Sequence, residues 1–96
     1  MDDAQLDEAL RALAHPTRRA VIRKTVDQEV PASELADALG IAPATASEHL
    51  KVLRKSGLVH LTADGTWRRY RANLERVQEI RAALFEHLPS PAKEAP

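Results

Sequence analysis

The chain has 96 residues, of which 44% are hydrophobic and 3% aromatic, with no cysteine and a formal net charge of zero. This length allows one domain with a small core of Leu, Val, Ile and Ala, and so small a core favours self-association that buries further apolar surface. The lack of cysteine excludes disulfides and thiolate sites. Because no apolar run approaches the ~18 residues of a membrane span and no basic-then-apolar leader is visible, we expect a cytoplasmic protein.

The first part of the chain predicts two helices. Residues 1–14 begin with acidic side chains, which favour a helix N-terminus, and then place Leu6, Leu10 and Leu13 on one helical stripe. Pro16 predicts the start of a second helix. One side of this second helix is basic, and we interpret it as a solvated face in preference to a DNA contact. Its cations are Arg18, Arg19, Arg23 and Lys24.

Two further short helices are predicted on either side of a tight turn. After one or two extended residues at Val30, a helix runs from Pro31 to Leu39, and the next helix begins at Pro43. Gly40 stands where the first of these helices needs a positive φ, and Pro43 stands where the second needs a fixed φ without an N–H. This arrangement is the helix-turn-helix, which presents its second helix to the major groove of DNA.

The second helix of this pair has two distinct faces. Ala46, Leu50 and Leu53 recur at i, i+4 and i+7, so they predict its buried face. The remaining circumference carries small polar side chains near the start and cations near the end, suited to base edges and phosphates respectively. We therefore assign base reading to Thr45, Ser47 and Glu48, phosphate contacts to Lys51, Arg54 and Lys55, and a packing or phosphate-contacting role to His49.

A β-hairpin is predicted next. Residues 58–62 and 66–72 are β-prone and bracket a turn at Ala63, Asp64 and Gly65. Arg68 and Arg69 on its second strand are assigned to DNA phosphates in preference to covering the sheet. The aromatic residues Trp67 and Tyr70 are interpreted as packing residues.

The last helix predicts a dimer. Asn73 is a good N-cap for a helix over residues 74–88, whose apolar side chains are too many for so small a domain to hide. We therefore expect a homodimer, with Val77, Ile80, Leu84 and Leu88 of this helix facing the second copy. Residues 1–88 form the predicted domain, and residues 89–96 are predicted to be a disordered tail.

Positive charge is concentrated in the part predicted to touch DNA. Residues 42–71 hold six cations and two anions, a net charge of +4. The preceding and following parts of the chain carry net charges of −3 and −1. This distribution is the electrostatic footprint of a nucleic-acid-binding surface.

Four segments together resemble the winged helix-turn-helix of the ArsR/SmtB family of bacterial transcriptional regulators: ALAHPTRR (12–19), SELADALG (33–40), SEHLKVLRKSGLV (47–59) and GTWRRYRAN (65–73). The resemblance implies a mostly α fold with a small β-hairpin, in the order α-α-(β)-α-α-β-β-α. It also implies a dimeric repressor of an inverted-repeat operator in double-stranded DNA. In the family the first and last helices form the dimer interface, so the resemblance adds Leu6, Leu10 and Leu13 to the expected interface. Ala42, where a capping Ser is usual, and Glu48, where a basic or amide residue is frequent, depart from the family pattern.

The family's metal-sensing patterns are not met. A thiolate site on the third helix would need cysteines, and the last helix has one histidine, His87, in place of the family's Asp-x-His and His-x-x-Glu pairs. We expect no metal cofactor, and a weak nickel or zinc site at His87 is the less favoured alternative. The main rival function is a winged-helix protein-interaction module, or a regulator that needs a partner protein or a small-molecule effector. No nucleophile context or phosphate loop predicts an enzyme.

Overall fold

The computed structural model describes residues 1–88 and Pro91. The predicted tail, residues 89–96, therefore lies outside the described residues except for Pro91. Within the described part the elements are α1 (Asp3–Leu13), α2 (Pro16–Lys24), β1 (Val30–Pro31), α3 (Ala32–Leu39), α4 (Pro43–Lys55), β2 (Val59–Asp64), β3 (Trp67–Ala72) and α5 (Leu74–His87). This order confirms the predicted fold class.

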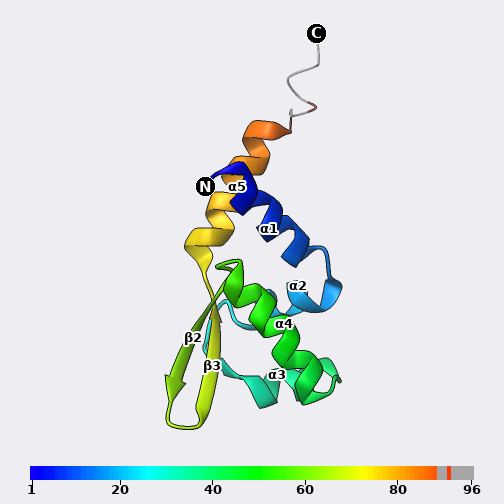
Figure 1. Ribbon diagram of the computed structural model, residues 1–96, viewed down its shortest axis with the longest axis vertical. Coiled ribbons are helices and arrows are strands. Elements are labelled where there is room, and N and C mark those ends of the chain that lie inside the picture. Colours follow the sequence, from blue (N-terminus) through cyan, green and yellow to red (C-terminus); the bar gives the residue numbers. More distant parts are fainter. Residues whose placement is uncertain (89–90, 92–96) are drawn as a thin grey trace.

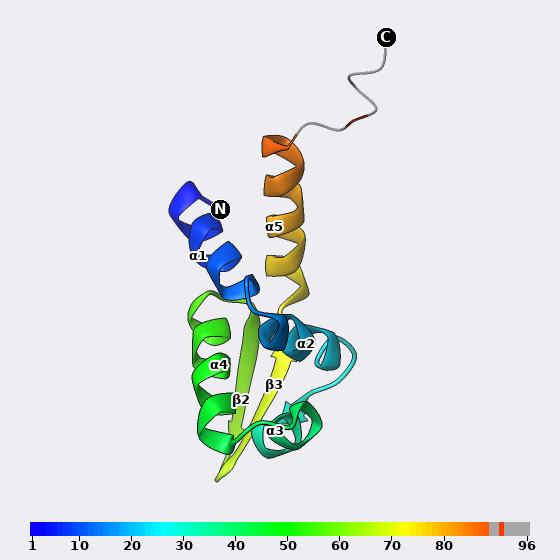
Figure 2. The ribbon, with the colours of Figure 1, turned by 90° about the vertical axis from the view of Figure 1, so that its right-hand side faces the viewer.

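The elements separate toward the two ends of the molecule. Figures 1 and 2 both place α1 and α5 together at one end, and α3 and the tip of the β2–β3 hairpin at the other. Helix α4 runs alongside the hairpin between these ends. No helix in the described part of the chain is long and apolar enough to cross a bilayer.

Local sequence signals explain where the outer helices begin. At the start of α1, the Asp2 side chain accepts a hydrogen bond from the Gln5 backbone N–H (2.8 Å), and the Gln5 side chain accepts one from the Asp2 N–H (2.9 Å). This reciprocal pair is a capping box. At the start of α5, the Asn73 side chain accepts from the Arg76 N–H, so the predicted N-cap is confirmed.

The turn between α3 and α4 has the predicted chemistry. Gly40 has φ 65°, and the Ile41 N–H donates to the Ala36 carbonyl at 3.1 Å. These are the left-handed residue and the long backbone bond of a Schellman motif. Pro43 then opens α4 as its first residue. The prediction that Pro31 opens α3 is wrong by one residue, since Pro31 is still extended (ψ 147°) and pairs with Arg69 at the sheet edge, where its missing N–H is tolerated.

The hairpin forms with its turn shifted by one residue from the prediction. Strand β3 lies between β1 and β2, and Asp64 pairs with Trp67, which leaves Gly65 and Thr66 as a two-residue loop. Gly65 has φ 61°, the positive angle that a type II′ turn requires at its first central position. The two-residue turn therefore places Gly65 at its first central position, where a positive φ is needed. We call residues 59–72 the wing.

The core joins the helix-turn-helix to both terminal helices. Its fully buried side chains include Leu35, Leu50, Leu53 and Leu58. Leu6 of α1 and Ile80 of α5 belong to the same cluster. Burying a side chain of this size contributes about 1.5–3 kcal/mol relative to leaving it exposed, so α4 is held firmly against the rest of the domain.

Candidate nucleic-acid interface

Helix α4 has the two faces that its sequence predicts. Ala46, Leu50 and Leu53 are buried. The side chains assigned to base edges and phosphates are all exposed: Thr45, Ser47, Glu48, Lys51, Arg54 and Lys55. The packed face fixes the helix, and its opposite side presents polar groups and three cations to solvent.

The start of α4 has no side-chain cap. Ala42 occupies the N-cap position with extended φ and ψ of −65° and 147°, and alanine offers no oxygen to the N–H groups of the first turn. We expect Ala42→Ser to raise the free energy of unfolding by about 1 kcal/mol, because a serine hydroxyl accepts one of these bonds. Urea unfolding at equilibrium measures the change.

Ala44→Ser is the matched control for Ala42→Ser. It adds the same hydroxyl two residues further on, inside the helix, where serine has a lower helix propensity than alanine. Its expected effect is a loss of about 0.5 kcal/mol or less. Equal effects of the two substitutions would contradict the assignment of Ala42 as an uncapped N-cap.

His49 lies between α4 and α2. Its Nδ1 atom accepts a hydrogen bond from Arg18 Nε at 3.1 Å, and its ring centroid lies 6.0 Å from that of His15. Burial lowers the pKa of His49 from its ordinary value, and the nearby charges of Arg18 and His15 lower it further. This geometry is that of a helix-packing residue, while a phosphate contact by His49 stays a prediction.

The basic side of α2 is only partly the solvated face that the sequence indicates. Arg23 and Lys24 are exposed, but Arg18 is half-buried and bonded to His49. Arg19 donates to the Leu13 carbonyl at 2.7 Å, at the end of α1. Sequence reasoning missed the role of Arg18 because its partner on α4 is 31 positions away.

Arg68 and Arg69 lie on opposite faces of the wing, because successive side chains alternate along a strand. Arg68 shares its face with Tyr70, which is 8% exposed and packs in the core, whereas Arg69 lies on the outer face with Trp67. Within residues 1–88, neither guanidinium forms an ion pair with a carboxylate. Both charges therefore remain available to phosphates.

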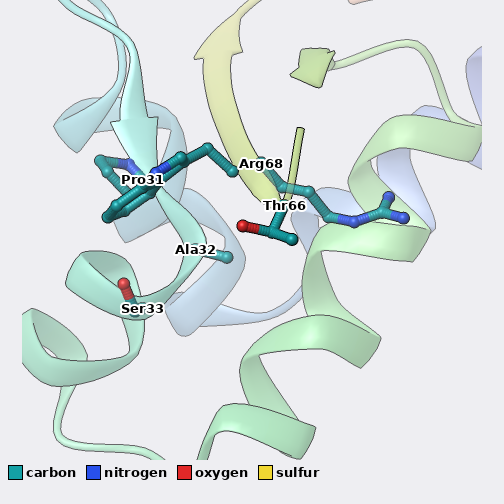
Figure 3. A pocket seen from close by; sticks show the side chains of 6 residues that line it. Pro31, Ala32, Ser33, Thr66 and Arg68 are labelled. Carbon is teal, nitrogen blue, oxygen red and sulfur yellow. The ribbon is translucent and has the colours of Figure 1, made fainter. Parts of the chain in front are cut away.

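The wing and the start of α3 enclose an open hollow of about 320 Å³. Figure 3 shows that Ala32 and Ser33 reach it from α3, while Thr66 and Arg68 come from the wing. Trp67 also lines it, with 56% of its surface exposed. The interpretation of Trp67 as a packing residue is therefore wrong, because its outer sheet face stays open to solvent next to the turn.

The structure divides the predicted dimer residues into two groups. Leu6 and Ile80 are 7% and 3% exposed within a single chain, so these two assignments are corrected to the chain's own core. Leu10, Leu13, Val77 and Leu84 are half-buried and pack partly against that core. Leu88 remains 62% exposed.

Exposed apolar side chains also lie along the outside of α5. Leu74 and Phe85 are 52% and 72% exposed, and together with Leu88 they follow the helical spacing of one face. Gln78 and Arg81 complete this stripe between them, with the spacing 74, 78, 81, 85, 88. We call these five residues the outer stripe. Its alternating steps of four and three residues are those of helices that pack side by side.

His87 lies beside the start of α1. Its Nε2 atom is 3.9 Å from Asp3 Oδ1, and both side chains are mostly exposed. Within the described residues, no group of three or more His, Asp or Glu side chains is placed to hold a metal ion. A single chain thus brings together two possible ligands at this point.

The chain is similar in sequence to known helix-turn-helix regulators. A family model described as "Helix-turn-helix domain" matches residues 13–62. The HTH-type transcriptional regulator KmtR of Mycobacterium tuberculosis is 37% identical over 73 residues, which cover 76% of this chain and 56% of KmtR. The chain therefore spans about half the length of this curated relative.

Two solved structures have a similar fold. A crystal structure of an ArsR family transcriptional regulator superposes with a TM-score of 0.82 at 30% identity, over 91% of this chain and 90% of that chain. A solution structure from Mycobacterium bovis, of a homodimeric winged helix-turn-helix DNA-binding domain, gives a TM-score of 0.73 at 25% identity. That similarity covers 93% of this chain and 92% of the other.

Proposed function

Because the chain belongs to the ArsR family of winged helix-turn-helix regulators, we propose that it is a DNA-binding transcriptional repressor, not an enzyme, that acts in the cytoplasm. The observation that carries this proposal is the placement of the exposed polar and cationic side of α4 on a firmly packed helix-turn-helix with a cationic wing. A rigid helix of this kind can enter the major groove while the wing contacts the neighbouring backbone.

The proposed contacts follow the two ends of α4. Thr45, Ser47 and Glu48 lie at its start and would read base edges, with the Glu48 carboxylate suited to a cytosine amino group. The cations in the C-terminal half of α4 would contact phosphates: Lys51, Arg54 and Lys55. Arg68 and Arg69 would contact the backbone from the two faces of the wing.

The protein would act as a homodimer on an inverted repeat. One solved relative is homodimeric, and the outer stripe of α5 leaves three large apolar side chains exposed on a single chain. Pairing of two such stripes, flanked by α1, would remove this surface from water. Two-fold symmetry then requires two matching half-sites about 10 base pairs apart.

The central test is binding to the DNA upstream of the protein's own gene. Fluorescence anisotropy should show operator affinity at least about 1,000-fold above that for a random duplex of equal length, the lower end for specific DNA-binding proteins. Equal affinity for both duplexes would instead favour the rival function, a winged-helix protein-interaction module. A partner protein or small-molecule effector that modulates binding is compatible with the first result.

A nickel or zinc site is the less favoured alternative. The observation behind it is the approach of His87 to Asp3. One imidazole and one carboxylate are fewer ligands than structural zinc sites use, so we propose that no metal regulates this protein. Nickel or zinc added at tenfold excess should change operator affinity equally in the wild type and in His87→Ala. Release of DNA by metal in the wild type alone would establish the sensor.

A further inference from the structure

Arg18 connects three helices through one side chain. From α2, its Nε atom donates to His49 Nδ1 on α4 (3.1 Å), and its terminal nitrogen lies 3.5 Å from the Ala12 carbonyl on α1. Both Arg18 and His49 are half-buried. The bond between them is thus a direct polar link from α2 to the helix that would read DNA.

This bond restricts the protonation state of His49. A guanidinium can only donate, so Nδ1 must be the unprotonated nitrogen, and the proton of the neutral ring then lies on Nε2. Protonation of Nδ1 would replace the acceptor with a second donor and would set two cations against each other. The bond shown by the structure therefore belongs to neutral His49.

The surroundings of His49 favour the same state. Burial is the largest cause that lowers its pKa from the ordinary value of 6.5, followed by the charges of Arg18 on α2 and His15 before it. The other elements that pack against α4, namely α1, α3 and β2, supply none of the charges that shift it. Within residues 1–88, no carboxylate forms an ion pair with His49 to stabilise its charged form.

We propose that the Arg18–His49 hydrogen bond is a positioning contact that holds α4 for DNA reading, and that acidification releases it by protonating His49. The inference rests on the proposed function of α4 and adds a regulation to it. His49 lies two residues from both Ser47 and Lys51, so a shift of α4 at this point would displace side chains assigned to bases and to phosphates.

The pH dependence has a definite sign. Because the pKa of His49 is lowered in the folded protein, its contribution to stability is complete above the ordinary value of 6.5. The contribution declines as the pH falls through the folded-state pKa. A histidine that contacted phosphate directly would act in the opposite direction, since its protonation would add a positive charge and strengthen binding.

The first measurement needs no DNA. Nitrogen-15 spectra of the full chain should show His49 with a bare Nδ1 and a protonated Nε2 at about pH 7.5. The same spectra should show a shifted Arg18 Nε–H signal, which His49→Asn retains and His49→Leu loses. Asparagine places an oxygen near the position of Nδ1 but does not titrate, whereas leucine removes the acceptor.

The second measurement is operator affinity at about pH 7.5 and at an acidic pH where the nitrogen-15 spectra show His49 protonated. Arg18→Met should weaken binding at the higher pH by about two- to tenfold, the range for one lost hydrogen bond. On acidification the wild type should lose about two- to tenfold more affinity than His49→Asn does. Arg23→Met removes an exposed cation from the same helix and should match the wild type at both values.

The outcomes separate this proposal from the proposed function. An equal pH response in the wild type and His49→Asn, or unchanged affinity in Arg18→Met, would overturn the positioning contact while leaving DNA binding in place. Failure to prefer the operator at any pH would overturn the function instead. In that case the nitrogen-15 spectra still decide whether the hydrogen bond exists and whether it requires neutral His49.

Discussion

Phe85→Asp should convert a dimeric protein into a monomer and lower its operator affinity by about 100-fold or more. Two linked half-site contacts exceed either one alone by about 10²–10⁴-fold, and a monomer loses that gain. Phe85 is 72% exposed in a single chain, so the substitution leaves the core of the domain intact while it places a charge within the proposed pairing surface. Light scattering coupled to size exclusion measures the mass directly.

Two controls define this experiment. Ala38→Asp adds the same charge at an exposed position on α3, and it should leave a two-chain mass. Leu84→Asp also touches the core, since Leu84 packs partly against it, so we expect loss of stability in addition to dissociation. A wild-type monomer at micromolar concentration, or a dimeric Phe85→Asp protein, would contradict the pairing of outer stripes.

Replacing both Arg68 and Arg69 with alanine should weaken binding to every DNA sequence and flatten its dependence on salt. Each lost phosphate contact lowers the slope of log K against log salt by about 0.9. The double-variant dimer would lack four such contacts. Between about 50 and 200 mM salt, the affinity of the wild type would therefore fall by a factor roughly 100 times larger than that of the double variant. Sequence preference should stay the same, because these contacts carry no base information.

The single variants refine this prediction. Arg68 and Arg69 lie on opposite faces of the wing, so their effects on the slope should add. Lys24→Ala removes an exposed cation from α2 and serves as the control with an unchanged slope. Should the double variant keep the wild-type affinity and slope, the wing would have no role in phosphate binding.

Much of the helix-turn-helix could be predicted because its signals are local. Gly40 takes the positive φ and Pro43 the fixed φ that the turn requires, and both act within a few residues of their own position. The two faces of α4 follow from a spacing of three to four residues. The hairpin was predictable in kind, but its turn moved by one residue because the position of Gly65 in the turn depends on the pairing of Asp64 with Trp67.

Contacts between distant segments could not be predicted in the same way. Arg18 and His49 are 31 positions apart, and only the crossing of α2 and α4 brings their side chains within hydrogen-bond distance. Trp67 is aromatic and could have packed inward, yet its place on the outer sheet face leaves it exposed. The spacing of residues along a chain carries no information on contacts between segments that are distant in sequence.

The sequence by itself determined the order of the elements, the helix-turn-helix turn and the cationic character of the segment proposed to contact DNA, because dihedral preferences and helical or strand periodicity act locally. Only the tertiary structure decided which side of α5 packs against the core of its own chain. Periodicity reveals that a face is apolar, but water is excluded equally well by the same chain or by a second copy. The packing of Ile80 against the core assigned one face to the monomer and left Leu74, Phe85 and Leu88 exposed on the other.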